Sequence, residues 1–183
     1  MKKPIIVNLF GGPSSGKSTT AAGLFHKLKI QGINCEIVTE FAKHMTWKED
    51  FNTLKNQVYV HAKQYDRIFH LIDKVDVIIT DSPTIMGLIY CDWNVFPISF
   101  ETLVVDLFNS QGDNLNYLLR RSTPYQTMGR SQTEEEAKEK DWQIVDLITK
   151  HDLECYMIEG DESAVDRILE QINERLENRN KHV

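Results

Sequence analysis

The sequence has few cysteines, and they are poorly placed for a structural role. Its 183 residues include only Cys35, Cys91 and Cys155, an odd and widely spaced set. Such a set fits neither a disulfide framework nor a zinc site built on C-x-x-C pairs. We therefore expect reduced thiols and a cytoplasmic protein.

The sequence also lacks a long apolar run and an excess of basic residues. The run after Lys2 and Lys3 is only about six residues long, far short of the roughly 20 that cross a bilayer. We expect no membrane partner. With 21 basic and 27 acidic side chains the net charge is -6, so no global field draws the chain to nucleic acid. Any polyanionic ligand must therefore be bound by basic side chains gathered at one site.

Alternating strand and helix patterns predict an α/β fold. The β-branched apolar run at 4–10 is typical of a strand buried on both faces. Further strands are expected at 34–40, 75–80, 114–121 and 155–160, and helices at 17–31, 52–73, 84–90, 99–108, 132–150 and 163–179. The segment 41–50 is predicted to be irregular. This order predicts one domain over 1–183, a three-layer sandwich around a five-stranded, mainly parallel sheet.

In such sheets ligands bind at the carboxyl ends of the strands. We therefore expect Gly11, Glu40, Asp81 and Arg120, which end four of the predicted strands, to meet at one crevice. The acid run in the first turn of the predicted helix 132–150 is interpreted instead as a solvated helix face, not a metal site.

A glycine-rich stretch between the first strand and the first helix matches G-x-x-x-x-G-K-[ST] without a gap, which is a P-loop. In this motif backbone amides wrap phosphates, Lys17 neutralises their oxygens and the Ser18 hydroxyl binds Mg²⁺. The residues expected to bind ATP here are Gly11, Gly12, Pro13, Ser14, Ser15, Gly16, Lys17, Ser18 and Thr19. The fold is accordingly predicted to be a P-loop NTPase sandwich.

The P-loop leaves the fate of the phosphate open, because GTPases, motor ATPases and small-molecule kinases all use it. The chain has no NKxD-type motif for reading guanine, and it is short for a motor ATPase. These two observations favour a kinase.

Two carboxylates are the candidates for catalysis. Asp81 ends the strand VDVIIT and is predicted to hold Mg²⁺; the alternative is a helix cap ahead of Pro83. Glu40 ends the second strand and is predicted to bind or deprotonate an acceptor hydroxyl; the alternative is an exposed glutamate. The two roles are interchangeable at this stage.

The segment 120–131 has the composition of a closing lid. Arg120, Arg121 and Arg130 flank a loop with turn-forming residues, and guanidinium groups stabilise phosphoryl charge. Arg130 is predicted to be catalytic, and Arg120 and Arg121 to bind the nucleotide. The alternative is a set of surface arginines, and the pattern does not decide which one points inward.

Gln57, His61 and Gln64 lie on one stripe of the predicted helix 52–73. Glutamine amides can pair with the edge of a nucleobase, so the stripe is a candidate for base recognition. A solvated helix edge is the alternative.

A family resemblance is carried by the P-loop and by the stretches VTEFAK, VDVIITDSP and RRSTPYQTMGRSQTEEEA. The chain resembles the kinase domain of the NadR-type nicotinamide riboside kinase family, particularly small stand-alone members found in tailed phages. The resemblance implies five parallel strands, ATP with Mg²⁺, and phosphorylation of a nucleoside-like hydroxyl. It implies that Lys17 and Ser18 hold phosphates and metal, Asp81 metal or acceptor, Glu40 the acceptor, and Arg130 the lid contact. No adenylyltransferase segment like that of NadR is seen, so other nucleosides or nucleotides stay open as acceptors.

The leading hypothesis is a kinase that transfers the γ-phosphoryl group of ATP to a hydroxyl or phosphate of a nucleoside- or nucleotide-like small molecule. One alternative is a kinase acting on hydroxymethylated bases in DNA. Another is a nucleotide-binding regulatory switch with slow ATP hydrolysis. The oligomeric state is left open.

Overall fold

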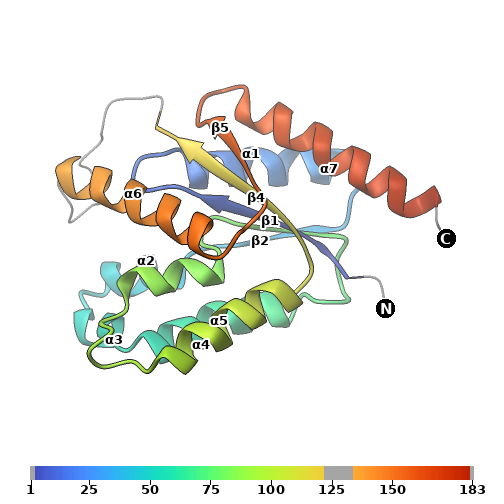
Figure 1. Ribbon diagram of the computed structural model, residues 1–183. Coiled ribbons are helices and arrows are strands. Elements are labelled where there is room, and N and C mark those ends of the chain that lie inside the picture. Colours follow the sequence, from blue (N-terminus) through green and yellow to red (C-terminus); the bar gives the residue numbers. More distant parts are fainter. Residues whose placement is uncertain (1–2, 122–133, 182–183) are drawn as a thin grey trace.

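The computed structural model describes residues 3–121 and 134–181, and its centre is a parallel β-sheet (Figure 1). The five strands lie in the order β2-β3-β1-β4-β5, and every neighbouring pair is parallel. They are β1 (Ile5–Phe10), β2 (Cys35–Val38), β3 (Val77–Thr80), β4 (Asp113–Arg120) and β5 (Cys155–Glu159). The predicted α/β fold with a five-stranded parallel sheet is confirmed.

Helices cover both faces of this sheet and make the three layers visible in Figure 1. They are α1 (Lys17–Ile30), α2 (Phe41–Trp47), α3 (Phe51–Lys55), α4 (Gln57–Phe69), the 3₁₀ helix η1 (Thr84–Tyr90), α5 (Ile98–Ser110), α6 (Glu134–Lys150) and α7 (Ala164–Lys181). Helices α1 and α7 pack together on one face. Helices α4, α5 and α6 contribute to the apolar clusters on the other face. Among the described residues, no helix is both long and apolar enough to cross a membrane.

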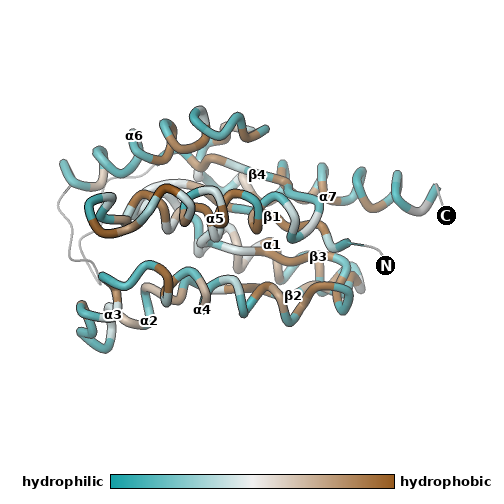
Figure 2. Tube along the Cα trace, turned by 60° about the horizontal axis from the view of Figure 1, so that its bottom comes forward, coloured by the Kyte–Doolittle hydropathy of each residue, from teal (hydrophilic) through white to brown (hydrophobic). Residues whose placement is uncertain are grey.

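The central strand β1 shows why the sheet needs cover on both sides. Ile5, Val7 and Leu9 belong to the apolar cluster formed with α1 and α7. Ile6 and Phe10 point the other way, into the clusters formed with α4 and with α5 and α6. This period of two follows from the pleat, and burial on both faces explains the nearly continuous apolar run. Figure 2 shows the complementary pattern in the helices, where hydrophobic and hydrophilic stretches alternate.

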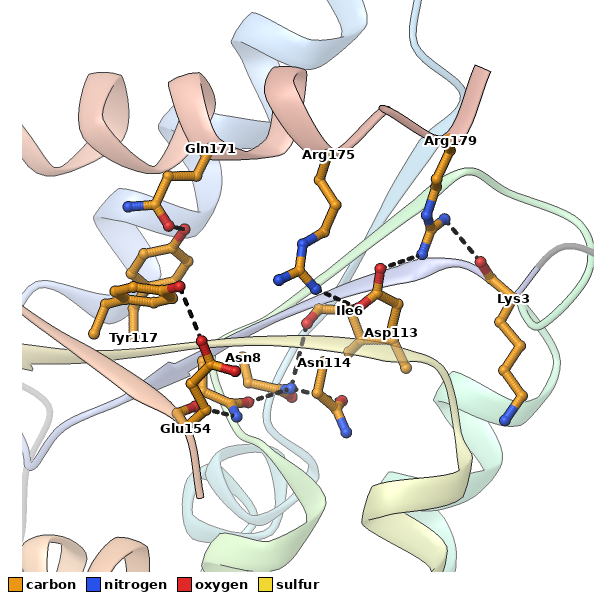
Figure 3. Close-up of polar contacts among 12 residues, drawn as sticks. Lys3, Ile6, Asn8, Asp113, Asn114, Tyr117, Glu154, Gln171, Arg175 and Arg179 are labelled. Atoms are coloured by element: carbon orange, nitrogen blue, oxygen red, sulfur yellow. Dashed lines mark hydrogen bonds and ion pairs between the residues drawn. The ribbon is translucent and has the colours of Figure 1, made fainter. Parts of the chain in front are cut away.

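One polar residue interrupts the apolar strand β1. Asn8 is 1% exposed, and its Nδ2 donates to the side-chain oxygens of Asn114 and Asn116 in β4, each at 2.9 Å (Figure 3). A buried amide without partners would be costly, so this pairing offsets its burial. It also favours the observed register, in which Asn8 lies opposite Asn116.

Two predictions about segment 41–73 were wrong. Residues 41–47 form α2 instead of irregular chain, because Phe41 and Met45, one helical turn apart, pack with Val60 of α4. The predicted helix 52–73 is in fact α3 and α4, separated at Asn56, and it ends at Phe69. The Asn56 side chain accepts a hydrogen bond from the Tyr59 amide and so starts a new helix.

Helix α7 is anchored to the beginning of β4 by charge. The Asp113 carboxylate binds Arg175 and, at 2.6 Å, Nη2 of Arg179 (Figure 3). One turn earlier in α7, Gln171 accepts a hydrogen bond from the hydroxyl of Tyr117 in β4 at 2.8 Å. The side chains of Asp113, Arg175 and Arg179 are all partly shielded from water. Their interaction should therefore contribute more to the stability of the fold than a surface salt bridge does.

We therefore expect Asp113→Ala to destabilise the protein by roughly 1–3 kcal/mol, because two guanidinium groups lose their carboxylate. For a chain of this size each kcal/mol lowers the melting temperature by about 2–4 °C, which calorimetry can measure. The matched control is Asp166→Ala, which removes the exposed pair with Lys27 and should cost less than about 1 kcal/mol. Equal losses in the two variants would contradict this account of α7.

Candidate functional site

The glycine-rich loop joins β1 to α1, as the sequence predicts, and its backbone curls tightly. Gly11 has φ +144° and Gly16 has φ +89°, both in a region that favours glycine. Ser14 also has a positive φ, of 65°. At Gly11 an added Cβ would lie 2.9 Å from the Leu119 carbonyl oxygen, so β4 closes on the loop as well. The curl therefore depends on residues that lack a side chain.

The turn after β5 packs directly against this loop. Gly160 donates its amide to the Arg120 carbonyl at 2.8 Å, and a Cβ at Gly160 would lie 2.2 Å from the Ser15 carbonyl oxygen. A side chain at this position would displace the loop. The sequence prediction missed Gly160; the only available signal was a glycine that immediately follows the last strand.

Lys17 lies across the loop. Its Nζ donates to the carbonyl oxygens of Gly11 at 2.6 Å and of Gly12 at 2.8 Å. The ammonium is thus held beside the N-terminus of α1, where backbone amides and the helix dipole favour an anion. A phosphate bound to that helix terminus would meet the Lys17 charge.

Asp81 follows β3 and contacts both the start of α1 and the residue that ends the β2 segment, Glu40. It is 6% exposed, its Oδ2 accepts from the Ser18 hydroxyl at 2.7 Å, and its Oδ1 accepts from the Glu40 amide at 3.2 Å. The 3₁₀ helix η1 begins at Thr84, directly after Pro83, and its N-terminus has no side-chain cap, so the Asp81 carboxylate does not act as a helix cap. Glu40 and Asp81, two of the four residues expected to meet, therefore lie beside each other at the carboxyl ends of β2 and β3.

The pair Ser18 and Asp81 suits a hard divalent cation. A hydroxyl and a carboxylate are the oxygen ligands that Mg²⁺ prefers, and Mg²⁺ commonly takes its other ligands from phosphates and water. Within ranges 3–121 and 134–181, no group of three or more His, Cys, Asp or Glu residues is placed to hold a metal ion. A metal site here would therefore be completed by a bound phosphate.

Glu40 is half-buried beside Asp81. Burial raises the pKa of its carboxyl, the Lys17 ammonium acts in the opposite direction, and the nearby Asp81 charge raises it further. Tyr90 of η1 lies near Glu40. Burial, together with the negative charge of the Glu40 carboxylate, raises the pKa of the Tyr90 hydroxyl to about 12. The Lys140 ammonium of α6 lies 4.7 Å from the centre of the Tyr90 ring. Tyr90 thus has Glu40 on one side and the Lys140 ammonium over its ring.

Gln64 holds the two carboxylate-bearing loops together. Its Oε1 accepts from the Phe41 amide at 2.8 Å, and its Nε2 donates to the Ser82 carbonyl at 3.2 Å. These two residues directly follow Glu40 and Asp81, so the Gln64 amide is already engaged within the protein. It positions the carboxylates in this structure, a role that the sequence pattern did not indicate.

The rest of the predicted recognition stripe is buried, so the alternative of a solvated helix edge was wrong. Gln57 is 5% and His61 7% exposed. The Gln57 amide donates to the Leu54 carbonyl at 2.7 Å. His61 lies against Tyr65 and Phe100, and burial lowers the pKa of its imidazole. Base recognition by this stripe stays a prediction.

Two of the three arginines of the predicted lid lie within the described residues, and they differ in their contacts. Arg121 lies beside the glycine-rich loop and donates from Nη2 to the Pro13 carbonyl at 3.0 Å. Arg120 is exposed and pairs with Glu159 of β5 at 3.4 Å. Arg130, with the rest of the segment 122–131, lies outside the described residues.

Asp141 of α6 is a further site residue that the sequence pattern did not predict. It lies beyond the acid run of the first turn, on the same helix, and its Oδ1 accepts from the Gly12 amide at 2.9 Å while its Oδ2 accepts from Arg121 at 3.0 Å. Only the packing of α6 on the loop reveals this contact.

Comparisons with known proteins agree with the fold. A family model described as an AAA domain matches residues 6–164. No curated protein gives a significant match. Two solved structures of deoxyadenosine kinase from M. mycoides are similar in fold, one with bound dATP and one with the products dCMP and a flexible dCDP. They are 17% and 15% identical, with TM-scores of 0.57 and 0.56, and each similarity covers 92% of this chain and 99% of the kinase.

The charges around Glu40 predict how its titration responds to substitution. By ¹³C NMR we expect the pKa of the Glu40 carboxyl to lie above that of an ordinary glutamate. Lys17→Met should raise this pKa further, because a stabilising positive charge is lost. Asp81→Asn should lower it, because a repelling negative charge is lost. Shifts in the same direction for both variants would contradict the arrangement.

Proposed function

Because the chain belongs to the AAA domain family and shares the P-loop kinase fold, we propose that it is an ATP-dependent kinase acting on a nucleoside- or nucleotide-like acceptor. The observation that carries the proposal is the meeting of Lys17, Ser18, Asp81 and Glu40 at one edge of the sheet. A switch that only binds nucleotide needs a phosphate site. A kinase also needs a carboxylate for the acceptor, and Glu40 is such a group.

On the nucleotide side, residues 11–19 hold the ATP phosphates through backbone amides at the start of α1. The Lys17 ammonium exchanges the Gly11 and Gly12 carbonyls for phosphate oxygens, which become more negative during transfer. Arg121, beside Pro13, stays close to the same phosphates or to the adenosine. Arg120 and Arg130 remain candidates for lid contacts.

Ser18 and Asp81 would hold Mg²⁺, which when bound screens the phosphate charge. Asp81 also keeps Glu40 at a set distance from Ser18, since one carboxylate binds both the Ser18 hydroxyl and the Glu40 amide. This arrangement aligns the metal ligands with the group that handles the acceptor.

On the acceptor side, Glu40 acts as the general base. Its carboxylate takes the proton of the acceptor hydroxyl as the new O–P bond forms and the bond from the γ-phosphorus to the β,γ-bridging oxygen breaks, so that ADP leaves. A raised pKa makes this carboxylate a stronger base than an exposed glutamate. It follows that transfer declines as the pH falls through that raised pKa, because the base becomes protonated.

The acceptor class rests on two considerations. A similar solved structure, of deoxyadenosine kinase, carries a deoxynucleoside monophosphate and diphosphate as products. The chain also resembles NadR-type kinases, whose acceptor is a nucleoside. We therefore propose a nucleoside or nucleoside monophosphate acceptor, with nicotinamide riboside among the nucleosides to be tested.

The proposal is tested by ADP production that depends on an acceptor. We expect ADP to form with one member of a panel of nucleosides, nucleotides and nicotinamide riboside, and Lys17→Ala to slow this reaction by about 10²-fold or more at unchanged circular dichroism. Lys27→Ala, on the exposed side of the same helix, is the matched control and should retain activity.

A Lys17→Ala rate within about tenfold of wild type would contradict the role of the loop. ADP production that no small acceptor stimulates would favour the regulatory switch. Stimulation by hydroxymethylated DNA alone would favour the DNA kinase.

The two carboxylates should respond to different substrates. We expect Asp81→Asn to raise the Mg²⁺ concentration needed for half-maximal activity, because a metal ligand loses its charge. Glu40→Gln should chiefly lower turnover of the acceptor, because the base is lost while the metal ligands stay. Separate titrations of Mg²⁺ and acceptor check this, and exchanged profiles would mean that the roles are reversed.

A further inference from the structure

Helix α6 contacts the first half of the glycine-rich loop through one carboxylate. Asp141 Oδ1 accepts from the Gly12 amide at 2.9 Å, and Oδ2 accepts from Arg121 Nη2 at 3.0 Å. Arg121 in turn donates from Nε and Nη2 to the Pro13 carbonyl, at 3.3 and 3.0 Å. These contacts form a closed ring around the backbone of Gly12 and Pro13, held by groups outside the loop.

The identity of residue 12 supports a fixed contact with α6. The motif G-x-x-x-x-G-K-[ST] leaves this position open, so phosphate binding does not itself require glycine there. A Cβ at position 12 would lie 2.2 Å from Asp141 Oδ1 and 3.2 Å from the Ala137 carbonyl oxygen. A side chain at this position would therefore displace the Asp141 carboxylate from its contact with the Gly12 amide.

The ring is built from strong interactions in a partly shielded place. The Arg121 side chain is 12% exposed and that of Asp141 38%. Hydrogen bonds that involve a charged partner are stronger than neutral ones, and fewer water molecules compete for them here. The ring thus restrains the backbone of Gly12 and Pro13 from outside the loop.

The restraint on Gly12 also affects Lys17, at the other end of the loop. The carbonyl of Gly12, whose amide Asp141 binds, is also an acceptor for Lys17 Nζ, at 2.8 Å. A shift of Gly12 therefore changes where the ammonium lies. We propose that Asp141 is a positioning residue for ATP, which holds the loop in its phosphate-binding shape from α6. This inference rests on the proposed function and concerns the nucleotide side of the site only.

Equilibrium binding of a non-hydrolysable ATP analogue to the whole chain tests the proposal without any acceptor. We expect Asp141→Ala to weaken binding about tenfold, as for loss of a charged hydrogen-bond partner. Asp141→Asn should recover part of the loss, because its amide oxygen can still accept from Gly12. In the kinase assay, KM for ATP should rise while KM for the acceptor stays unchanged.

The matched control is Asp146→Ala, which alters an exposed carboxylate on the same helix and should bind the analogue like wild type. Gly12→Ala supplies a second, independent measurement. Alone it should weaken binding, because the new Cβ collides with Asp141. Combined with Asp141→Ala it should cost little beyond the single Asp141→Ala change, because the obstacle is gone.

Equal analogue binding by wild type and Asp141→Ala, or multiplicative losses in the double variant, would overturn the positioning role. A loss that falls equally on ATP and acceptor, with no recovery in Asp141→Asn, would also overturn it in favour of a general effect on folding. Absence of analogue binding by the wild type would instead contradict the proposed function.

Discussion

The site depends on a single buried carboxylate, that of Asp81. One of its oxygens accepts from the Ser18 hydroxyl at the start of α1, and the other accepts from the Glu40 amide that follows β2. Asp81 itself directly follows β3, which lies between β1 and β2 in the sheet. A carboxylate buried at this depth needs such partners, and by taking them it connects the ends of β2 and β3 with the start of α1. The arrangement of the candidate site thus follows from satisfying one buried side chain.

The surrounding structure keeps those strand ends in place. The parallel register is supported by apolar residues on both faces of β1 and by the Asn8 amide between β1 and β4. Gln64 of α4 ties the segments after Glu40 and Asp81 to each other. The loop is enclosed by Gly160 on one side and by Asp141 on another. Each of these contacts joins residues far apart in the sequence, so the site is a product of the whole sheet.

Local patterns predicted much of this arrangement. The P-loop was recognisable because its spacing follows from phosphate geometry, and the strands because burial on both faces requires continuous apolar runs. The prediction failed where distant packing decides the structure. Helix α2 forms because Phe41 and Met45 pack against Val60 of α4. The break at Asn56 arises because the Asn56 side chain caps the N-terminus of α4. Neither event has a periodic signal of its own.

The sequence by itself determined the fold class, the phosphate-binding loop and the strand ends at which Glu40 and Asp81 lie. These features depend on residue type and spacing along the chain, which a sequence records directly. Only the tertiary structure decided which side chains complete the site. Gln64, Asp141 and Gly160 matter because packing brings them to the loops, and a glutamine, an acid on a helix or a glycine after a strand has no such meaning before the chain has folded.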